Sequence, residues 1–286
     1  MIIAPDAKKA NKISFYAIGD QGTGGFWQYL VSAKMELDCQ SSRDVNFTLL
    51  LGDNFYFDGV DNVNDPQFNE AFEEPYSSRC LSGMPFYAIL GNHDYRGNPY
   101  AQIEYSKLAK GSGRWKMPNN TYVKDFGDKS GTPIIRLVVI DTQKPMEGQI
   151  ELLKESFSGN NRAMWNIVAG HKPIKSYGLK YHAKYYTVQD ILPVLKELKV
   201  DIYIAGHSHN LQLIEEKERP IFIISGGGGK PTRALIDGNK PGLLYGEDKN
   251  GFVKITATEE TLVIIFNTIL KDKAFEYHLY RQKNKS

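Results

Sequence analysis

One local pattern recurs along the chain: a short apolar run ends at a glycine, and a polar side chain follows. The runs are only a few residues long and rich in Ile, Val, Leu, Phe and Tyr, which is typical of strands buried on both faces. Glycine lets the chain turn sharply where such a strand ends. The five runs span residues 13–19, 47–52, 86–91, 167–170 and 202–206, and they are followed by Asp20, Asp53, Asn92, His171 and His207.

Segments compatible with helices separate these runs and cover residues 24–38, 66–79, 99–109, 147–157 and 187–198. In the last of them, Thr187 and Asp190 are placed as a capping pair. Alternating strands and helices predict an α/β fold, in which ligands gather beyond the carboxyl ends of the strands. We therefore expect the five polar residues to share one rim.

The last third of the chain has a different character. Residues 221–225, 251–257 and 261–267 are predicted strands with short connections, which favours antiparallel pairing. The glycines of 226–229 lack the residues of a phosphate-binding motif, so we expect a flexible loop at the rim of the site. No composition break, proline-rich linker or internal repeat divides the chain, and we expect a single domain over residues 1–286.

Composition narrows the range of functions. The hydrophobic fraction of 41% and the charged fraction of 24% are ordinary for a globular protein. No apolar stretch approaches the ~20 residues that a membrane-spanning helix needs. The net charge is +2 without a dense basic block, so we expect no nucleic-acid partner.

The strand ends gather residue types that bind metals. Four of the six histidines, His93, His171, His207 and His209, lie in these turns, and Tyr56 follows Asp53 by three residues. Two metal ions about 3.5–4 Å apart need a bridging carboxylate, further oxygen and imidazole ligands, and open positions for water and substrate. These turns supply such donors, so the sequence predicts a site for two metal ions.

The same turns carry a family resemblance. The chain resembles the calcineurin-like metallophosphoesterases and, within them, the purple acid phosphatases of the small tartrate-resistant type, from about Ile13 to about Asn267. The resemblance implies an α/β fold of two packed mixed β-sheets flanked by helices, an α-β-β-α sandwich. The motifs that carry it are Gly19-Asp20-Gln21-Gly22, Gly52-Asp53-Asn54-Phe55-Tyr56, Gly91-Asn92-His93-Asp94, Ala169-Gly170-His171 and Gly206-His207-Ser208-His209.

One detail indicates the subfamily. Metallophosphoesterases in general place a histidine two residues after the first aspartate, whereas this chain has Gly22, which cannot bind a metal. Tyr56 stands where purple acid phosphatases have a metal-bound tyrosinate. The ligand sets implied by the resemblance are Asp20, Asp53, Tyr56 and His209 for one metal, and Asp53, Asn92, His171 and His207 for the other.

These ligand sets favour different metals. A phenolate with two carboxylates is a hard, anionic set that suits Fe(III), whereas two imidazoles and an amide oxygen suit a divalent ion, here Fe, Zn or Mn. We expect a binuclear acid phosphatase that hydrolyses phosphate monoesters by attack of a metal-bound hydroxide on phosphorus. The alternatives are a phosphodiesterase or nucleotide pyrophosphatase of the same superfamily, and a non-catalytic domain that binds phosphate or metal.

Two further histidines are candidates for contact with the substrate. His93, next to Asn92, is the first candidate for protonating the leaving group. His182 lies where the family presents a histidine to the phosphate, and a solvated loop histidine is the alternative. Asp94 either orients His93 or stabilises the turn. Five other side chains flank the motifs, and they are expected either to line a pocket or to contribute ordinary packing: Phe26, Trp27, Phe57, Tyr95 and Arg96.

Partners and compartment are only weakly constrained. We expect a monomer that acts on a small phosphorylated substrate, such as a phosphopeptide or nucleotide, without proteolytic activation, because the repressive loop of the animal enzymes is absent. The first five residues are too short for a signal peptide, which leaves a secreted, periplasmic or lysosome-like protein with its leader removed, or a cytoplasmic one. Cys39 and Cys80 are free thiols or one disulfide, and they do not occupy the place expected for the animal disulfide.

Overall fold

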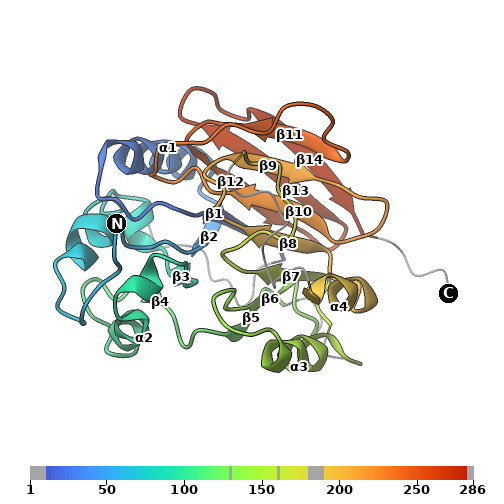
Figure 1. The fold of residues 1–286 in the computed structure, drawn as a ribbon, viewed down its shortest axis with the longest axis horizontal. Coiled ribbons are helices and arrows are strands. Elements are labelled where there is room, and N and C mark those ends of the chain that lie inside the picture. The colour runs from blue at the N-terminus through green and yellow to red at the C-terminus, as the bar shows by residue number, and fades with distance from the viewer. Residues whose placement is uncertain (1–10, 129–130, 160–161, 180–189, 282–286) are drawn as a thin grey trace.

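The structure is a computed structural model that describes residues 11–128, 131–159, 162–179 and 190–281. Two seven-stranded β-sheets pack face to face, and helices cover their outer faces (Figure 1). The predicted α/β fold with two mixed sheets and flanking helices is confirmed. None of the helices in the described residues combines the length and apolar surface that crossing a bilayer requires.

The first sheet has the strand order β14-β13-β12-β1-β2-β3-β4. Strands β1 to β4 run parallel to one another, whereas β12, β13 and β14 pair antiparallel. Strands β1 and β12, which are far apart in sequence, therefore lie side by side. The bounds are β1 Ile13–Ile18, β2 Val45–Leu50, β3 Phe86–Ala88, β4 Trp115–Lys116, β12 Gly251–Ala257, β13 Thr261–Thr268 and β14 Phe275–Tyr280.

The second sheet has the order β11-β9-β10-β8-β7-β6-β5. Its four central strands, β10, β8, β7 and β6, are parallel, and its outer strands pair antiparallel. The parallel strands therefore form the half of the first sheet that ends at β4 and the middle of the second sheet. The bounds are β5 Tyr122–Phe126, β6 Ile135–Val139, β7 Trp165–Ala169, β8 Ile202–Ala205, β9 Leu211–Ile214, β10 Ile221–Ser225 and β11 Leu243–Glu247.

Strand β1 shows why the central runs are apolar throughout. Phe15 and Ala17 belong to the core between the two sheets, whereas Tyr16 and Ile18 belong to the core beneath α1. Phe15 stacks on Phe47 of β2, with ring centroids 4.8 Å apart. Because alternate side chains enter two different cores, both faces of the strand must be apolar.

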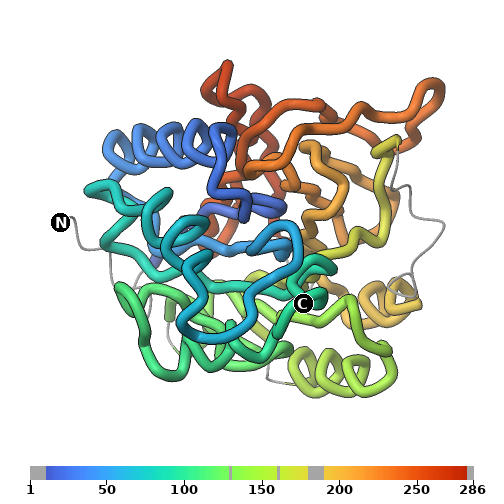
Figure 2. The backbone as a smooth tube through the Cα atoms, turned by 60° about the vertical axis from the view of Figure 1, so that its left-hand side comes forward, coloured from blue at the N-terminus to red at the C-terminus, as the bar shows by residue number. Residues whose placement is uncertain are grey.

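The helices are α1 (Phe26–Ser42), α2 (Pro99–Lys107), α3 (Glu147–Phe157) and α4 (Leu192–Glu197). The α1 helix packs on the first sheet, whereas α3 and α4 pack on the second. The bounds of α3 are those predicted, and α2 begins with Pro99 in its first turn, after Asn98 accepts a hydrogen bond from the Tyr100 amide. Figure 2 shows α1 near the C-terminal strands, where Lys34 pairs with Asp272 at 2.9 Å.

Two predicted helices depart most from the structure. In the segment 66–79 the helix is confined to residues 67–73 and includes a π-helical turn over Asn69–Glu73, and it ends before Pro75, which has no N–H to continue the ladder. The helix predicted over 187–198 begins at Leu192, and Thr187 of its predicted capping pair lies outside the described residues. Short 3-10 turns cover Leu81–Gly83 and Asp94–Arg96.

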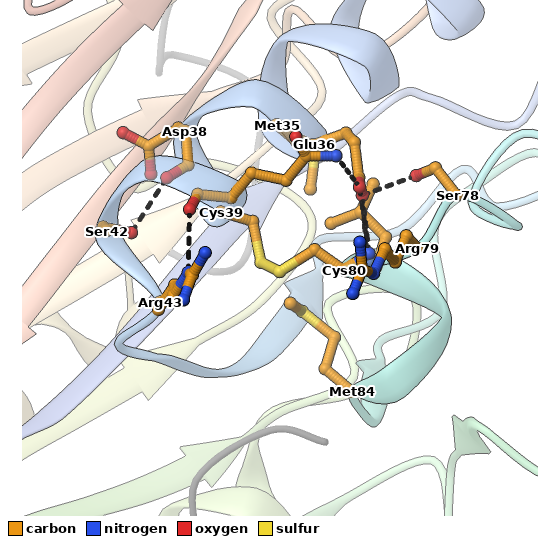
Figure 3. Close-up of a disulfide and its surroundings, with 12 residues drawn as sticks. Met35, Glu36, Asp38, Cys39, Ser42, Arg43, Ser78, Arg79, Cys80 and Met84 are labelled. Carbon is orange, nitrogen blue, oxygen red and sulfur yellow. Dashed lines mark hydrogen bonds between the residues drawn. A yellow bond between two sulfur atoms is a disulfide. The ribbon is translucent and has the colours of Figure 1, made fainter. Parts of the chain in front are cut away.

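Cys39 of α1 and Cys80 form a disulfide, which decides between the two alternatives left open by the sequence. Figure 3 shows Glu36 beside it, where the carboxylate accepts hydrogen bonds from the Ser78 hydroxyl at 2.7 Å and the Cys80 amide at 2.9 Å. Burial acts to raise the pKa of Glu36, but these hydrogen bonds outweigh it and lower the pKa. The carboxylate and the disulfide therefore both join α1 to the segment before β3.

The disulfide predicts a measurable contribution to stability. It closes a loop with a sequence separation of 41 residues. The Cys39→Ala/Cys80→Ala variant should lose about 2–4 kcal/mol of unfolding free energy in a urea titration, because the unfolded chain is no longer constrained. Dithiothreitol should weaken the wild type by a similar amount and leave the variant unchanged. Equal stability of variant and wild type would contradict the prediction.

Candidate metal centre

Strands from both sheets end at one rim, and the polar residues that follow them meet there. Asp20, Asp53 and Asn92 come after β1, β2 and β3 of the first sheet, as the order of the chain predicts. His171 and His207 come after β7 and β8 of the second sheet. Asn92 and His171 make contact between the sheets, with the amide Oδ1 3.2 Å from the ring Nε2.

The first group of donors is Asp20, Asp53 and His209, whose side-chain ligand atoms all lie within 4.8 Å of one another. Tyr56 points into this group. Its hydroxyl lies 2.9 Å from Asp53 Oδ2, 3.2 Å from Asp20 Oδ1 and 3.4 Å from His209 Nε2. The structure therefore brings together the four side chains predicted for one metal.

The second group is Asp53, His171 and His207, again with ligand atoms within 4.8 Å of one another. His207 Nδ1 lies 3.0 Å from His171 Nε2, and Asn92 joins the group through its contact with His171. Asp53 belongs to both groups. Its carboxylate is therefore placed where a ligand shared by two ions would have to be.

The acidic side chains of the centre are buried next to one another. Asp20 and Asp53 are 0% and 1% exposed. Burial, followed by the charge of Asp53, raises the pKa of Asp20 well above its ordinary value. Burial and then the charges of Asp20 and Asp53 raise the pKa of Tyr56. Because cations would offset this cost, the donor set fits a metal centre.

The histidines of the centre are held in the neutral form. Burial, followed by the positive charge of Arg233, lowers the pKa of His209 to about 3. Burial is also the largest cause of the lowered pKa of His171 and of His207. A neutral imidazole has the free lone pair that a metal requires, so all three rings are in the ligand form at physiological pH.

Backbone carbonyls orient the imidazole rings. The Nδ1–H of His171 donates to the Leu51 carbonyl at 2.8 Å, which leaves Nε2 facing Asp53. The Nδ1–H of His209 donates in the same way to the Pro231 carbonyl at 3.3 Å. Such partners select the tautomer and direction of a metal-binding ring. Sequence reasoning missed them because any residue can supply a carbonyl.

Four of the proposed ligands have backbone conformations that side chains rarely adopt. Their φ angles are positive: 58° at Asp20, 55° at Asp53, 66° at His207 and 52° at His209. Glycine would relieve this strain but would remove the side chain. Strain that persists where glycine would be easier is typical of functional sites.

Glycines allow the loops of the centre to approach one another. A Cβ on Gly22 would lie 1.8 Å from the Asn54 carbonyl oxygen, so no side chain fits at the position where related families have a histidine. A Cβ on Gly226 would lie 2.8 Å from Asp20 Oδ2. The segment 226–229 is therefore a buried wall of the centre, and the prediction of a flexible rim loop is wrong.

His93 lies at the open side of the centre. Its Nδ1–H donates to the Phe57 carbonyl at 2.6 Å, and its Nε2 lies 3.9 Å from Asp53 Oδ2. The side chain is 17% exposed.

Asp94 does not orient His93. Its carboxylate accepts hydrogen bonds from the Gly91 amide at 2.7 Å and from Gln102 Nε2 at 2.9 Å, as expected of a residue that stabilises the turn. His182 lies outside the described residues.

Lys230 is a residue of this region that the sequence did not reveal. Its backbone N–H donates to the Asp20 carbonyl at 3.0 Å, and its ammonium lies 4.5 Å from the centroid of the Tyr56 ring. A lone lysine after four glycines matches no phosphate-binding motif, so no local pattern marks it.

Comparisons with known proteins agree with the geometry. The family model of the calcineurin-like phosphoesterases matches residues 13–211. Purple acid phosphatase 7 of Arabidopsis thaliana is 33% identical, over 92% of this chain and 84% of the relative. Human tartrate-resistant acid phosphatase type 5 is 30% identical, over 88% of this chain and 87% of the relative.

A solved structure, described as GAP50, the anchor in the inner membrane complex of Plasmodium, is also similar. Its TM-score is 0.82 at 26% identity, over 96% of this chain and 90% of that chain.

The sequence matches and the buried donor set agree with the resemblance carried by the five motifs. The chain therefore belongs to the calcineurin-like phosphoesterases and, among them, to the purple acid phosphatases, which are hydrolases with a binuclear metal centre.

Proposed function

We propose that this protein hydrolyses phosphate monoesters at acidic pH. The observation that supports the proposal most directly is that Asp53 lies in both groups of metal donors. Asp20, Tyr56 and His209 would complete the first ligand set with Asp53. The second would be completed by the three remaining predicted ligands, which are Asn92, His171 and His207.

The chemistry of the donors supports two different cations. Tyr56 would bind as phenolate, and because burial and two carboxylates raise its pKa, only a strongly charged cation would favour that form. This supports Fe(III) in the first set, and the imidazoles of the second set support divalent Fe, Zn or Mn. When bound, the pair would supply an activated water and neutralise negative charge on the phosphate.

His93 is the proposed proton donor to the leaving group. Its Nδ1–H is committed to the Phe57 carbonyl, which directs Nε2 towards the centre. A partly exposed imidazole beside a buried cluster can contact both substrate and solvent, as a general acid must. His182, which the family resemblance suggests for contact with the phosphate, remains a prediction.

Two other functions are possible in principle: a phosphodiesterase, which has a different substrate, and a non-catalytic domain, which has no substrate. A diesterase of the same superfamily is less favoured, because Tyr56 and Gly22 follow the purple acid phosphatase pattern. The likeness to GAP50, described as an anchor, favours a non-catalytic domain as the second candidate. All seven proposed ligand side chains are present, however, and those of Asp20, Asp53 and Tyr56 converge within hydrogen-bonding distance. Such buried charge is expected of a domain that binds metal ions, and it would serve no purpose in an anchor that binds none.

The disulfide bears on the compartment. Disulfides persist in oxidising environments, so the Cys39–Cys80 bond supports a secreted, periplasmic or lysosome-like location over a cytoplasmic one. The proposed partner is a small phosphorylated molecule, and the proposed state is a monomer.

Substrate preference tests the proposed function. The purified, metal-loaded protein should hydrolyse an aryl phosphate monoester with a higher kcat/KM than the corresponding diaryl diester at acidic pH. The reason is that the monoester presents more anionic oxygens to the two cations. The reverse order would establish the diesterase, and a metal-loaded protein inert towards both esters would favour the non-catalytic candidate.

Tyr56→Phe tests the ligand that distinguishes the subfamily. The wild type loaded with iron should be purple, because a phenolate bound to Fe(III) gives a charge-transfer band in the visible spectrum. The variant should lose this band, whereas Tyr95→Phe should keep it, since the Tyr95 hydroxyl donates to Asp141 instead. A colourless wild type that is fully loaded with iron and active would refute the assignment.

His93→Ala separates catalysis from metal binding. Metal content should stay at the wild-type level, while kcat falls by about 10²-fold or more, as is usual when a general acid is lost. His278→Ala is the matched control, because His278 lies exposed on β14 and pairs with Glu276. Loss of metal together with activity in His93→Ala would instead make His93 part of the metal site.

A further inference from the structure

A cavity of about 250 Å³ lies directly beside the metal donors. Tyr56 forms part of its wall, so one side chain faces both the donor cluster and the cavity. The rest of the wall is largely aromatic, with Phe26 and Trp27 from the start of α1 and Phe57 from the loop after β2. A group held in this cavity is therefore continuous with the site of the chemistry.

The aromatic wall is unusually exposed. Phe26 is 69% exposed, Phe57 is 66% exposed and Trp27 is 39% exposed. Phe26 and Trp27 meet edge to face, with centroids 5.1 Å apart and ring planes at 69°. Leaving three large apolar rings in water around one cavity forgoes the stabilisation of burial, and a ligand that covers them would recover it.

Lys230 adds a positive charge to the wall of the cavity, next to Tyr56. Its ammonium lies 3.9 Å from the centroid of Phe57 and 4.5 Å from that of Tyr56, within the range of cation–π contact. Its backbone is held by the hydrogen bond to the Asp20 carbonyl. The cavity thus has apolar walls and one cationic corner, which together match a molecule with a flat apolar part and an anionic part.

We propose that this cavity binds a planar aromatic ring attached to the phosphate of the substrate. The ring would lie against Trp27 and Phe57 while the phosphate occupies the metal centre, so the inference rests on the proposed phosphatase function. Aromatic pairs gain stabilisation beyond simple area burial, and this favours an aromatic ring over a saturated one of similar size. Phenyl-type rings and nucleobases share this chemistry.

Two substrates that share the same kind of alkyl leaving group, and differ in whether the ring is aromatic, isolate the effect of the ring on kcat/KM. The wild type should hydrolyse 2-phenylethyl phosphate with a kcat/KM about three- to tenfold above that of 2-cyclohexylethyl phosphate, the range that aromatic pairing gives. Adenosine 5′-monophosphate and ribose 5-phosphate form the second pair. A higher kcat/KM for the aromatic member of the first pair alone would show that the cavity takes a phenyl-type ring, and a higher kcat/KM for adenosine 5′-monophosphate in the second pair would show that it takes a nucleobase. Equal rates within both pairs would overturn the inference.

Binding can be measured without turnover, because Trp27 is a natural reporter. The other two tryptophans, Trp115 and Trp165, are 1% and 0% exposed. Titration of the metal-loaded protein with 2-phenylethylphosphonate should change the Trp27 emission and give a lower Kd than 2-cyclohexylethylphosphonate. If no phosphate ester is hydrolysed, the proposed function fails, and this titration still decides whether the cavity selects aromatic rings.

Variants connect the preference to the cavity. Phe57→Leu retains Trp27 as the reporter, and in this variant the phenyl and cyclohexyl compounds should have about the same Kd and about the same kcat/KM. Trp27→Leu lacks the reporter, and in it the two substrates should have about the same kcat/KM. Both positions are exposed, so folding should be unaffected. Tyr29→Leu is the matched control, because Tyr29 is a 41% exposed aromatic residue of the same helix. A preference that survives Phe57→Leu and Trp27→Leu, or disappears in Tyr29→Leu, would show that the cavity does not produce it.

Discussion

The burial of two carboxylates against each other is the constraint on which the rest of the site depends. Asp20 and Asp53 are both buried and lie within the same group of donors, at positive φ angles that add backbone strain. Repulsion and desolvation oppose this arrangement, and the three imidazoles of the centre are neutral because burial lowers their pKa values. Bound metal ions would resolve the conflict, which is why the same atoms that destabilise the free protein would hold the metals.

The sandwich architecture divides the donors between its two sheets. The loops of the first sheet supply the oxygen donors Asp20, Asp53, Tyr56 and Asn92, and the loops of the second supply the imidazoles of His171, His207 and His209. Neither sheet alone presents both kinds of ligand. The apolar core between the sheets therefore sets the geometry of the centre, although none of its residues takes part in the chemistry.

Much of the fold and of the metal centre could be predicted from the sequence, because strand ends and helices are encoded by residues close together in the chain. A buried strand that ends in glycine places the next side chain at the rim, and five such ends supply five of the seven proposed ligands, while Tyr56 and His209 follow within a few residues. The helix α3 was predicted to the residue, since its apolar spacing is regular. The outer strands, such as β5 and β14, were missed because their mixed burial gives no continuous apolar run.

Features that depend on distant partners could not be predicted in this way. The pairing of Cys39 with Cys80 needs the packing of α1 on the segment before β3. The direction of each imidazole depends on carbonyl groups that any residue could provide. Lys230 reaches the cavity only because the loop of four glycines is folded against Asp20.

The shared role of Asp53 can be tested by locating the metals through anomalous X-ray diffraction in crystals of the wild type and of Asp53→Ala, with Asp58→Ala as an exposed control. If Asp53 is a ligand of both metals, the wild type and the control should hold two ions, and neither ion should reach full occupancy in Asp53→Ala. A single ion in the wild type, or two ions retained without Asp53, would contradict this shared role.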